Sequence, residues 1–192
     1  MKSFTSRIKW LFGAALLFVA FSPSAKAAVL DIHVSISATK SLQALTTTYQ
    51  FGALNLGVSS NSVTALVIRN NSGAYVETYT LQGANATSDT SGTSWTLNTT
   101  STGTNQYRLA AMFASSRPDN QDSTWGSEDY LDPTTPGTCD GTTYTDGTQT
   151  GAGVSPSPAA SAYDRNLWFR MITPGVSTGT EARTAQVTIA VQ

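Results

Sequence analysis

Short segments in which apolar and polar residues alternate recur along this chain, and they constrain its fold more than any other feature. Residues 30–37 read Leu-Asp-Ile-His-Val-Ser-Ile-Ser, and residues 185–191 alternate in the same way. A period of two residues places successive side chains on opposite faces of a strand. No segment after residue 28 has the 3.6-residue period of an amphipathic helix. The sequence therefore predicts strands joined by turns.

About eight strands are expected. Besides the two segments above, the candidates are residues 49–56, 62–69, 74–82, 94–98, 107–113 and 166–172. The alternation of residues 49–56 changes phase near Gly52 and Ala53, which indicates a β-bulge. Residues 70–73 tolerate positive φ, so a hairpin is expected between 62–69 and 74–82. Short strands without helical crossovers predict an all-β fold, an antiparallel β-sandwich of immunoglobulin-like (Ig-like) or jelly-roll type.

Residues 115–161 form one long irregular loop, dense in Gly, Pro, Thr and Asp. Loops of more than about 15 residues are uncommon in compact domains and are usually functional or disordered. A small hairpin around residues 142–145 is a candidate for ordering part of it. Cys139, the only cysteine, lies here among turn residues with no basic neighbour. We expect an unreactive loop cysteine, with an intermolecular disulfide as the alternative.

The first 27 residues have the features of a cleavable signal peptide. Basic residues at positions 2, 7 and 9 precede an uncharged apolar run over residues 10–21, too short to span a bilayer, which needs about 20 apolar residues. Ala25 and Ala27 occupy the positions that a signal peptidase reads, so cleavage is expected before Ala28. The expected organisation is a signal peptide over 1–27 and a single β-sandwich domain over 28–192, without a membrane helix. The mature chain is expected to be secreted, to the extracellular space, the cell surface or the periplasm.

The composition narrows the functions open to the mature chain. Removing residues 1–27 leaves seven Lys and Arg against twelve Asp and Glu, a formal charge of −5. An acidic chain without a basic stripe is a poor binder of nucleic acid. Charged residues are only 12% of the whole sequence, against about a quarter in typical domains. Such a surface suits packing against copies of the same chain, or a soluble sandwich with a hydroxyl-rich face.

Few residues are suited to catalysis. His33 is the only histidine, and the alternation places it on the strand face opposite Ile32 and Val34, so we expect it to face solvent rather than act as a base. A zinc site with several His or Cys ligands is excluded by count. The motifs of nucleophile elbows, phosphate-binding loops and dinucleotide-binding turns are not found. We therefore expect a protein that is not an enzyme.

Acidic and aromatic side chains are mixed within the long loop. Five carboxylates lie within fourteen residues: Asp119, Asp122, Glu128, Asp129 and Asp132. Oxygen ligands of this kind could bind calcium, which is the only cofactor that the sequence suggests. Trp125 and Tyr130 lie between them and could contact a glycan. Two further interpretations stay open, a solvated loop and a carboxylate pair that hydrolyses glycosides.

The signal peptide and four segments together resemble secreted bacterial surface proteins with sandwich domains, among them pilin-like and biofilm-fibre subunits. The four segments are the early strand 30–36, the segment 49–57, the Asn-rich turn 70–73 and the closing strand 186–191. The resemblance implies an extracellular structural subunit that assembles with itself into a fibre, pilus-like filament, sheath or matrix. The alternative is a monomeric secreted module that binds calcium or a glycan.

The first strand is the candidate assembly element. Its alternate apolar residues are Leu30, Ile32, Val34 and Ile36. These side chains could complete the sandwich of their own chain, or they could fill the core of a neighbouring copy by donor-strand exchange.

Overall fold

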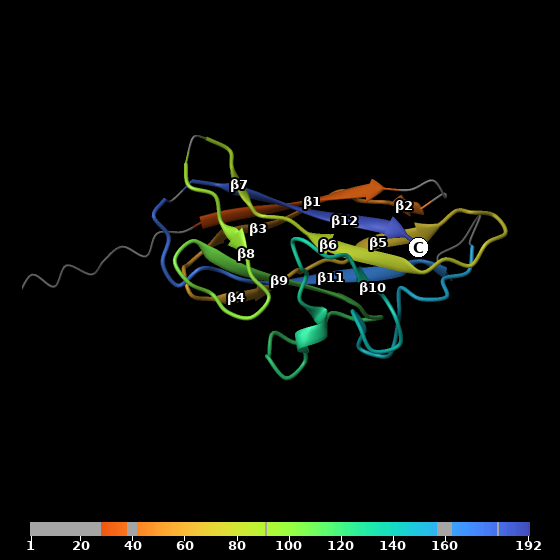
Figure 1. Ribbon diagram of the computed structural model, residues 1–192. Helices are drawn as coiled ribbons and strands as arrows, with labels where there is room; N and C mark the ends of the chain where they lie inside the picture. Colours follow the sequence, from red (N-terminus) through yellow and green to blue (C-terminus); the bar gives the residue numbers. More distant parts are fainter. Residues whose placement is uncertain (1–27, 38–41, 91, 157–162, 180) are drawn as a thin grey trace, which may run out of the picture.

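The computed structural model describes residues 28–37, 42–90, 92–156, 163–179 and 181–192, so the expected signal peptide lies outside the described residues. In the described part, two multi-stranded β-sheets pack face to face (Figure 1). The predicted all-β sandwich is confirmed. The described helical turn η1 (Ser127–Asp129) is three residues long. No described helix has the length and apolar character needed to cross a membrane.

Sheet A contains the first strand, next to its edge strand β3 (Thr48–Leu54). Its order is β10 (Gly137–Thr138), β6 (Tyr79–Gly83), β12 (Arg183–Val191), β1 (Ala28–Ser37) and β3, and β7 (Thr87–Ser88) also pairs with β12. Strand β1 is parallel to β12 and antiparallel to β3. The β1–β12 pair is thus an exception to the antiparallel pairing predicted from the sequence.

Sheet B forms the second layer. Its order is β2 (Leu42–Ala44), β5 (Leu66–Asn70), β11 (Arg165–Ile172), β9 (Gln106–Phe113) and β8 (Thr96–Leu97), and β4 (Ser59–Asn61) pairs with β11. All described pairs in this sheet are antiparallel except β8–β9. Every segment expected to be a strand contains at least part of one.

The predicted hairpin between β5 and β6 is wrong, because these strands belong to opposite sheets. Gly73 does have a positive φ of 75°, so the residues do turn the chain, but they carry it across the sandwich. Ile68 of β5 and Leu81 of β6 are both fully buried in the same core. Apolar faces of strands in opposite layers can pack against each other across a core. Two hydrogen-bonded neighbours in one sheet lie side by side, so they cannot enclose a core between them.

The predicted β-bulge in β3 is confirmed. Val29 pairs with Ala53 and Asp31 pairs with Gln50, so two residues of β3 lie opposite one residue of β1. Gly52 supplies the positive φ, 70°, that this irregularity needs.

Cys139 lies in the loop that follows β10, as predicted, but its side chain belongs to the core. Its side chain is fully buried, and burial raises the pKa of its thiol. A Cβ on Gly151 would lie 2.8 Å from the Cys139 sulfur, so the glycine makes room for it. A thiol enclosed in this way is not available for the alternative, a disulfide between copies.

Much of the long loop covers the outer face of sheet B. Trp125 and Tyr130 join side chains of β9 and β11 in a second apolar cluster, which also contains Ala110, Met112, Ala114 and Trp168. The small hairpin expected around 142–145 is not formed. Asp140 instead accepts hydrogen bonds from the amides of Thr142 and Thr143, both at 2.7 Å, and Thr145 forms an isolated bridge with Phe113. Turns of this kind order the loop locally.

Candidate assembly site

The position of β1 makes it the candidate site for association with other copies. Its backbone pairs with β12 from Leu30 to Ser37 on one side and with β3 on the other. Leu30 and Ile32 are 0% exposed and Val34 is 6% exposed, all three within the main core. The backbone of Ile36 continues the strand, while its side chain lies outside the described residues. Three of the four predicted assembly side chains therefore fill the core of their own chain.

The outward side of β1 makes contacts that fix its register. The hydroxyl oxygens of Ser35 and Thr188 lie 3.1 Å apart, a hydrogen bond to β12. The Gln50 amide of β3 donates to the Asp31 carboxylate at 3.4 Å. A one-residue slip would break these bonds and also turn the apolar set toward solvent.

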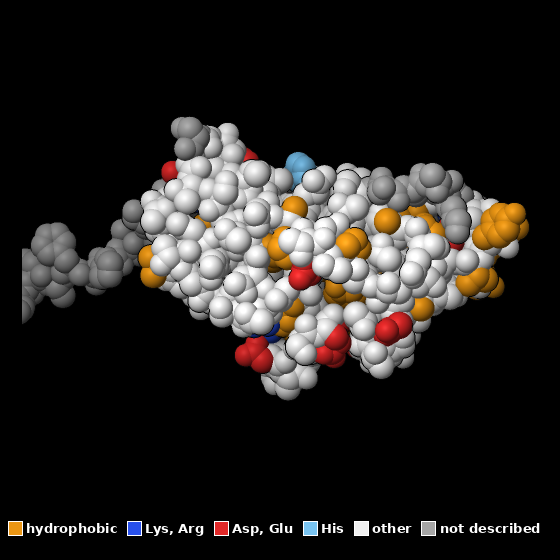
Figure 2. Space-filling model, in the orientation of Figure 1, with side chains coloured by type: hydrophobic (Ala, Val, Ile, Leu, Met, Phe, Trp, Pro, Cys, Tyr) orange, Lys and Arg blue, Asp and Glu red, His pale blue; other side chains and the backbone are white. Residues whose placement is uncertain are grey.

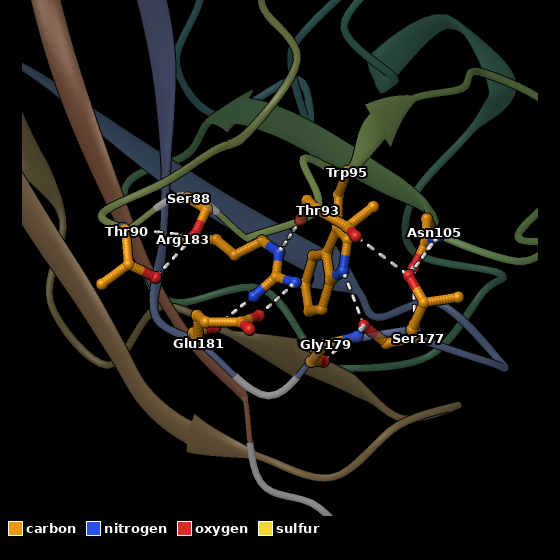
Figure 3. Close-up of polar contacts among 10 residues, drawn as sticks. Ser88, Thr90, Thr93, Trp95, Asn105, Ser177, Gly179, Glu181 and Arg183 are labelled. Atoms are coloured by element: carbon orange, nitrogen blue, oxygen red, sulfur yellow. Dashed lines mark hydrogen bonds and ion pairs between the residues drawn. The ribbon is translucent and has the colours of Figure 1, made fainter.

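Strand β12, one of the two neighbours of β1, is stabilised by contacts that do not involve β1. Arg183, the first residue of β12, is fully buried, and its guanidinium carbon lies 4.9 Å from the centre of the Trp95 ring. Its Nε donates to the Thr93 carbonyl at 2.8 Å, and its Nη2 lies 3.1 Å from a Glu181 carboxylate oxygen. Figure 3 shows the guanidinium alongside the indole with these contacts around it. Strand β12 also pairs with β6 and β7.

The same network fixes the chain that leads into β12. Trp95 donates through its indole nitrogen to the Ser177 hydroxyl at 3.1 Å. Asn105 exchanges hydrogen bonds with Thr178, including one of 2.9 Å from the Thr178 amide (Figure 3). Residues just before β12 are thus bound to the β8–β9 region.

Strand β3, the other neighbour, depends much more on β1. Among the described strands, β1 is the only one that pairs with β3. Side-chain contacts provide the remaining support: the Tyr49 hydroxyl accepts a hydrogen bond from the Val63 amide at 2.7 Å, and Tyr49 and Phe51 make an edge-to-face contact with their ring centres 5.0 Å apart. Loss of β1 would therefore leave β3 as a strand without a described partner.

An open pocket of about 370 Å³ lies over the boundary between β1 and β12. It is lined by His33, Ala84, Asn85, Thr87, Thr184 and Gln186. His33 is exposed, as predicted from the alternation, and it lies beside Gln186 in the strand register. The lining side chains offer hydroxyl, amide and imidazole groups for hydrogen bonding.

The five predicted calcium ligands are not brought together. Asp122 forms an ion pair with Arg170, Asp129 is buried and accepts a hydrogen bond from the Gly126 amide at 2.9 Å, and Asp132 accepts from the amide of Thr134 at 2.6 Å. Asp119 and Glu128 are exposed. Within the residues that the structure describes, which include all five, no three acidic, His or Cys side chains are placed to hold a metal ion.

The predicted glycan contacts are also placed differently from the expectation. Trp125 is 3% exposed and Tyr130 is 6% exposed, so neither ring offers a face for a sugar to stack on. Arg108 lies 3.5 Å from the centre of the Tyr130 ring, and Arg170 donates to the Tyr130 hydroxyl at 3.1 Å. These aromatic side chains attach the loop to sheet B.

Arg170 is the residue of this region that the sequence reasoning missed. It is 2% exposed, and its guanidinium binds Asn120, Asp122 and Tyr130, all from the covering loop. The only local signal was its position between Phe169 and Met171, on the face of the strand shared with Trp168.

No protein-family model matches this chain, and no curated protein sequence matches it significantly.

Proposed function

We propose that this chain is a non-enzymatic structural protein that is exported and that assembles with copies of itself by exchanging β1. The observation that carries the proposal is the position of β1, the first described strand, between β12 and β3. Cleavage before Ala28, as proposed from the signal peptide, frees the amino end of this strand. A strand with a free end can leave a sheet and enter another without threading the chain through a loop.

The energetics require that the place of β1 be filled. Burial of each large aliphatic side chain contributes about 1.5–3 kcal/mol, and Leu30, Ile32 and Val34 are all buried. Without β1, the core would be open and the facing edges of β12 and β3 would expose their backbone groups. A copy of β1 from a neighbour satisfies the same apolar and backbone contacts, so the native and exchanged forms differ mainly in association cost and in any new contact between subunits.

The composition also supports association of like subunits. The mature chain has a low charge density and a net charge of −5, so copies repel one another only weakly at physiological ionic strength. The assembled structure that the resemblance implies is a surface fibre, pilus-like filament, sheath or matrix.

Disulfide trapping with two single-cysteine variants tests the exchange. Asp31→Cys and Gln50→Cys, both in a Cys139→Ala background, are exported separately, mixed at high concentration and oxidised mildly. Asp31 and Gln50 are direct partners across β1 and β3, so only a β1 inserted into the other chain brings the two thiols together. We expect a mixed covalent dimer on a non-reducing gel.

The control for this trap pairs Asp31→Cys with Thr135→Cys. Thr135 is exposed and precedes β10, at the other edge of sheet A, so exchange does not bring this pair together. Equal yields from the test and control mixtures would mean random collision of thiols, and absence of the mixed dimer would overturn the proposed exchange.

A further inference from the structure

We propose that the exchange of β1 is reciprocal between two copies, whose like ends meet in a two-fold dimer through Tyr75 and Val76. This inference rests on the proposed function and adds the geometry of the contact. It follows from three observations: where β1 ends, how far the chain can reach from it, and which exposed side chains surround that point.

One end of the sandwich, which we call the exit pole, contains the end of β1 and the start of β2. Ser37 pairs with Ala190 near the end of β12, and Val191 pairs with Tyr79 at the start of β6. Leu42, at the start of β2, pairs with Asn70 at the end of β5. The segment 71–78 joins β5 to β6, so it lies at this same end, at the right of Figure 1.

The connection from β1 to β2 is short. Four residues, 38–41, join Ser37 to Leu42, and a chain step of about 3.3–3.6 Å per residue limits their reach to roughly 18 Å. When a donated β1 pairs in the native register, its carboxyl end lies at the exit pole of the acceptor. The chain then continues into β2 of the donor, which starts at the exit pole of the donor. The two exit poles must therefore face each other.

This constraint favours a closed pair over an open chain of exchanges. In an open chain of exchanges, each exit pole would have to contact two neighbouring subunits. One neighbour receives the β1 of that subunit, and the other donates its own β1 to it. Both neighbours would be held within the same short reach. In a reciprocal pair, one neighbour serves both purposes, and the interface has two-fold symmetry. A longer filament would then be built from pairs through another surface.

The exit pole has the apolar side chains that a contact between copies needs. Six large hydrophobic side chains are exposed in the described residues, and Tyr75, at 68%, and Val76, at 61%, both belong to segment 71–78. Tyr163, 45% exposed, lies two residues before β11, whose first residue Arg165 pairs with Ile68 near the same end. Figure 2 shows hydrophobic side chains on the surface at the right end of the molecule.

Charges beside this patch do not oppose the contact. Arg69 and Asp164 form an ion pair at 2.6 Å, so two facing copies bring together compensated charges. The opposite end of the sandwich, where β11 leads into β12, contains one of the six side chains, Val176. The distribution of exposed apolar residues therefore favours contact between exit poles.

Cross-linking of a single position with itself tests the symmetry. In a two-fold dimer, a residue near the axis lies close to its own copy, so Ala74→Cys in the exported Cys139→Ala protein should cross-link to itself with a short bis-maleimide. Val176→Cys, at the opposite end, is the matched control and should give little covalent dimer. Efficient cross-linking through Val176→Cys and not through Ala74→Cys would overturn the inference.

A second variant tests the apolar contact. Tyr75→Ser combined with Val76→Ser should raise the dimer dissociation constant at least tenfold, a rough figure from the burial of two large side chains. Val63→Ser combined with Val176→Ser removes equally exposed side chains away from the exit pole and should leave the dissociation constant within about twofold. Equal effects of the two double variants would contradict a specific contact at the exit pole.

The two proposals fail in distinguishable ways. If Asp31→Cys and Gln50→Cys give a mixed covalent dimer but Ala74→Cys does not cross-link to itself, exchange occurs by another geometry and only the present inference is wrong. If the mixed dimer does not form, the proposed exchange is wrong. In a protein that carries both Asp31→Cys and Gln50→Cys, covalent species of three or more chains on a non-reducing gel would show open exchange and would also overturn the closed pair.

Discussion

Asp129 is a carboxyl of the long loop whose pKa the fold raises. Its side chain is buried, and burial raises its pKa to about 7, aided by the neighbouring charge of Glu128 and opposed by hydrogen bonding from the Gly126 amide. The exposed Asp140 shows the opposite effect, because hydrogen bonds from Thr142 and Thr143 lower its pKa to about 2. The fold therefore raises the pKa of one carboxyl in the loop and lowers the pKa of another.

These shifts predict a pH dependence of stability. Between about pH 4 and pH 7, the folded state holds a proton on Asp129 that the unfolded state releases, so the free energy of unfolding falls as pH rises through this window. Asp129→Asn should flatten the dependence there, because the amide does not titrate. Denaturant titrations at about pH 4.5 and about pH 7.5, near the two edges of this window, measure the difference. Asp119→Asn is the exposed control, and an unchanged slope in Asp129→Asn would show that another group is responsible.

The contacts of Trp125 and Arg170 show what could not be predicted from the sequence. The position of Trp125 in a polar loop is compatible with an exposed binding face or with a buried anchor, and only the surface beneath it decides. The sequence did indicate an apolar surface for it to pack on, because residues 109–114 are all apolar and a strand of this kind is usually buried on both faces. The contact of Arg170 with the loop could not be inferred, because it joins residues about fifty positions apart.

At the scale of the element, β1 has one face in the core and one face outward. Ile32→Ala should lower the free energy of unfolding by about 2–5 kcal/mol, the usual cost of deleting a buried aliphatic side chain. Ser35→Ala, on the outward face of the same strand, removes a hydrogen bond to Thr188 and should cost about 1 kcal/mol. Urea denaturation of both variants checks the ratio, and comparable losses would mean that β1 is not held mainly by its apolar face.

The strands were predictable and their partners were not. Residue patterning is a local property: alternation located β1 and β12 from the sequence alone, and short segments rich in apolar residues located β9 and β11. Pairing depends on contacts between distant segments, such as the parallel register of Leu30 with Arg183. The turn residues 70–73 showed the same limit, because they specified a change of direction without specifying whether the chain stays in one sheet. The assembly residues were identified for the same local reason, as one face of an alternating strand.

At the scale of the whole molecule, export, strand order and association are connected. The proposed cleavage before Ala28 makes β1 the amino-terminal strand, and the sheet places that strand between β12 and β3. The short connection to β2 then directs any exchanged subunit to the exit pole. Each step depends on the previous one, so the state of association of the exported protein tests all of them together.

The most direct test is the molar mass of the exported protein by light scattering as its concentration increases. Intact mass first checks the proposed cleavage before Ala28. We expect the mass to rise from that of one chain to at least that of two, the pair from which a longer filament would be built, after incubation in mild denaturant to let β1 leave its sheet. The mass of a single chain at every concentration would contradict assembly by strand exchange.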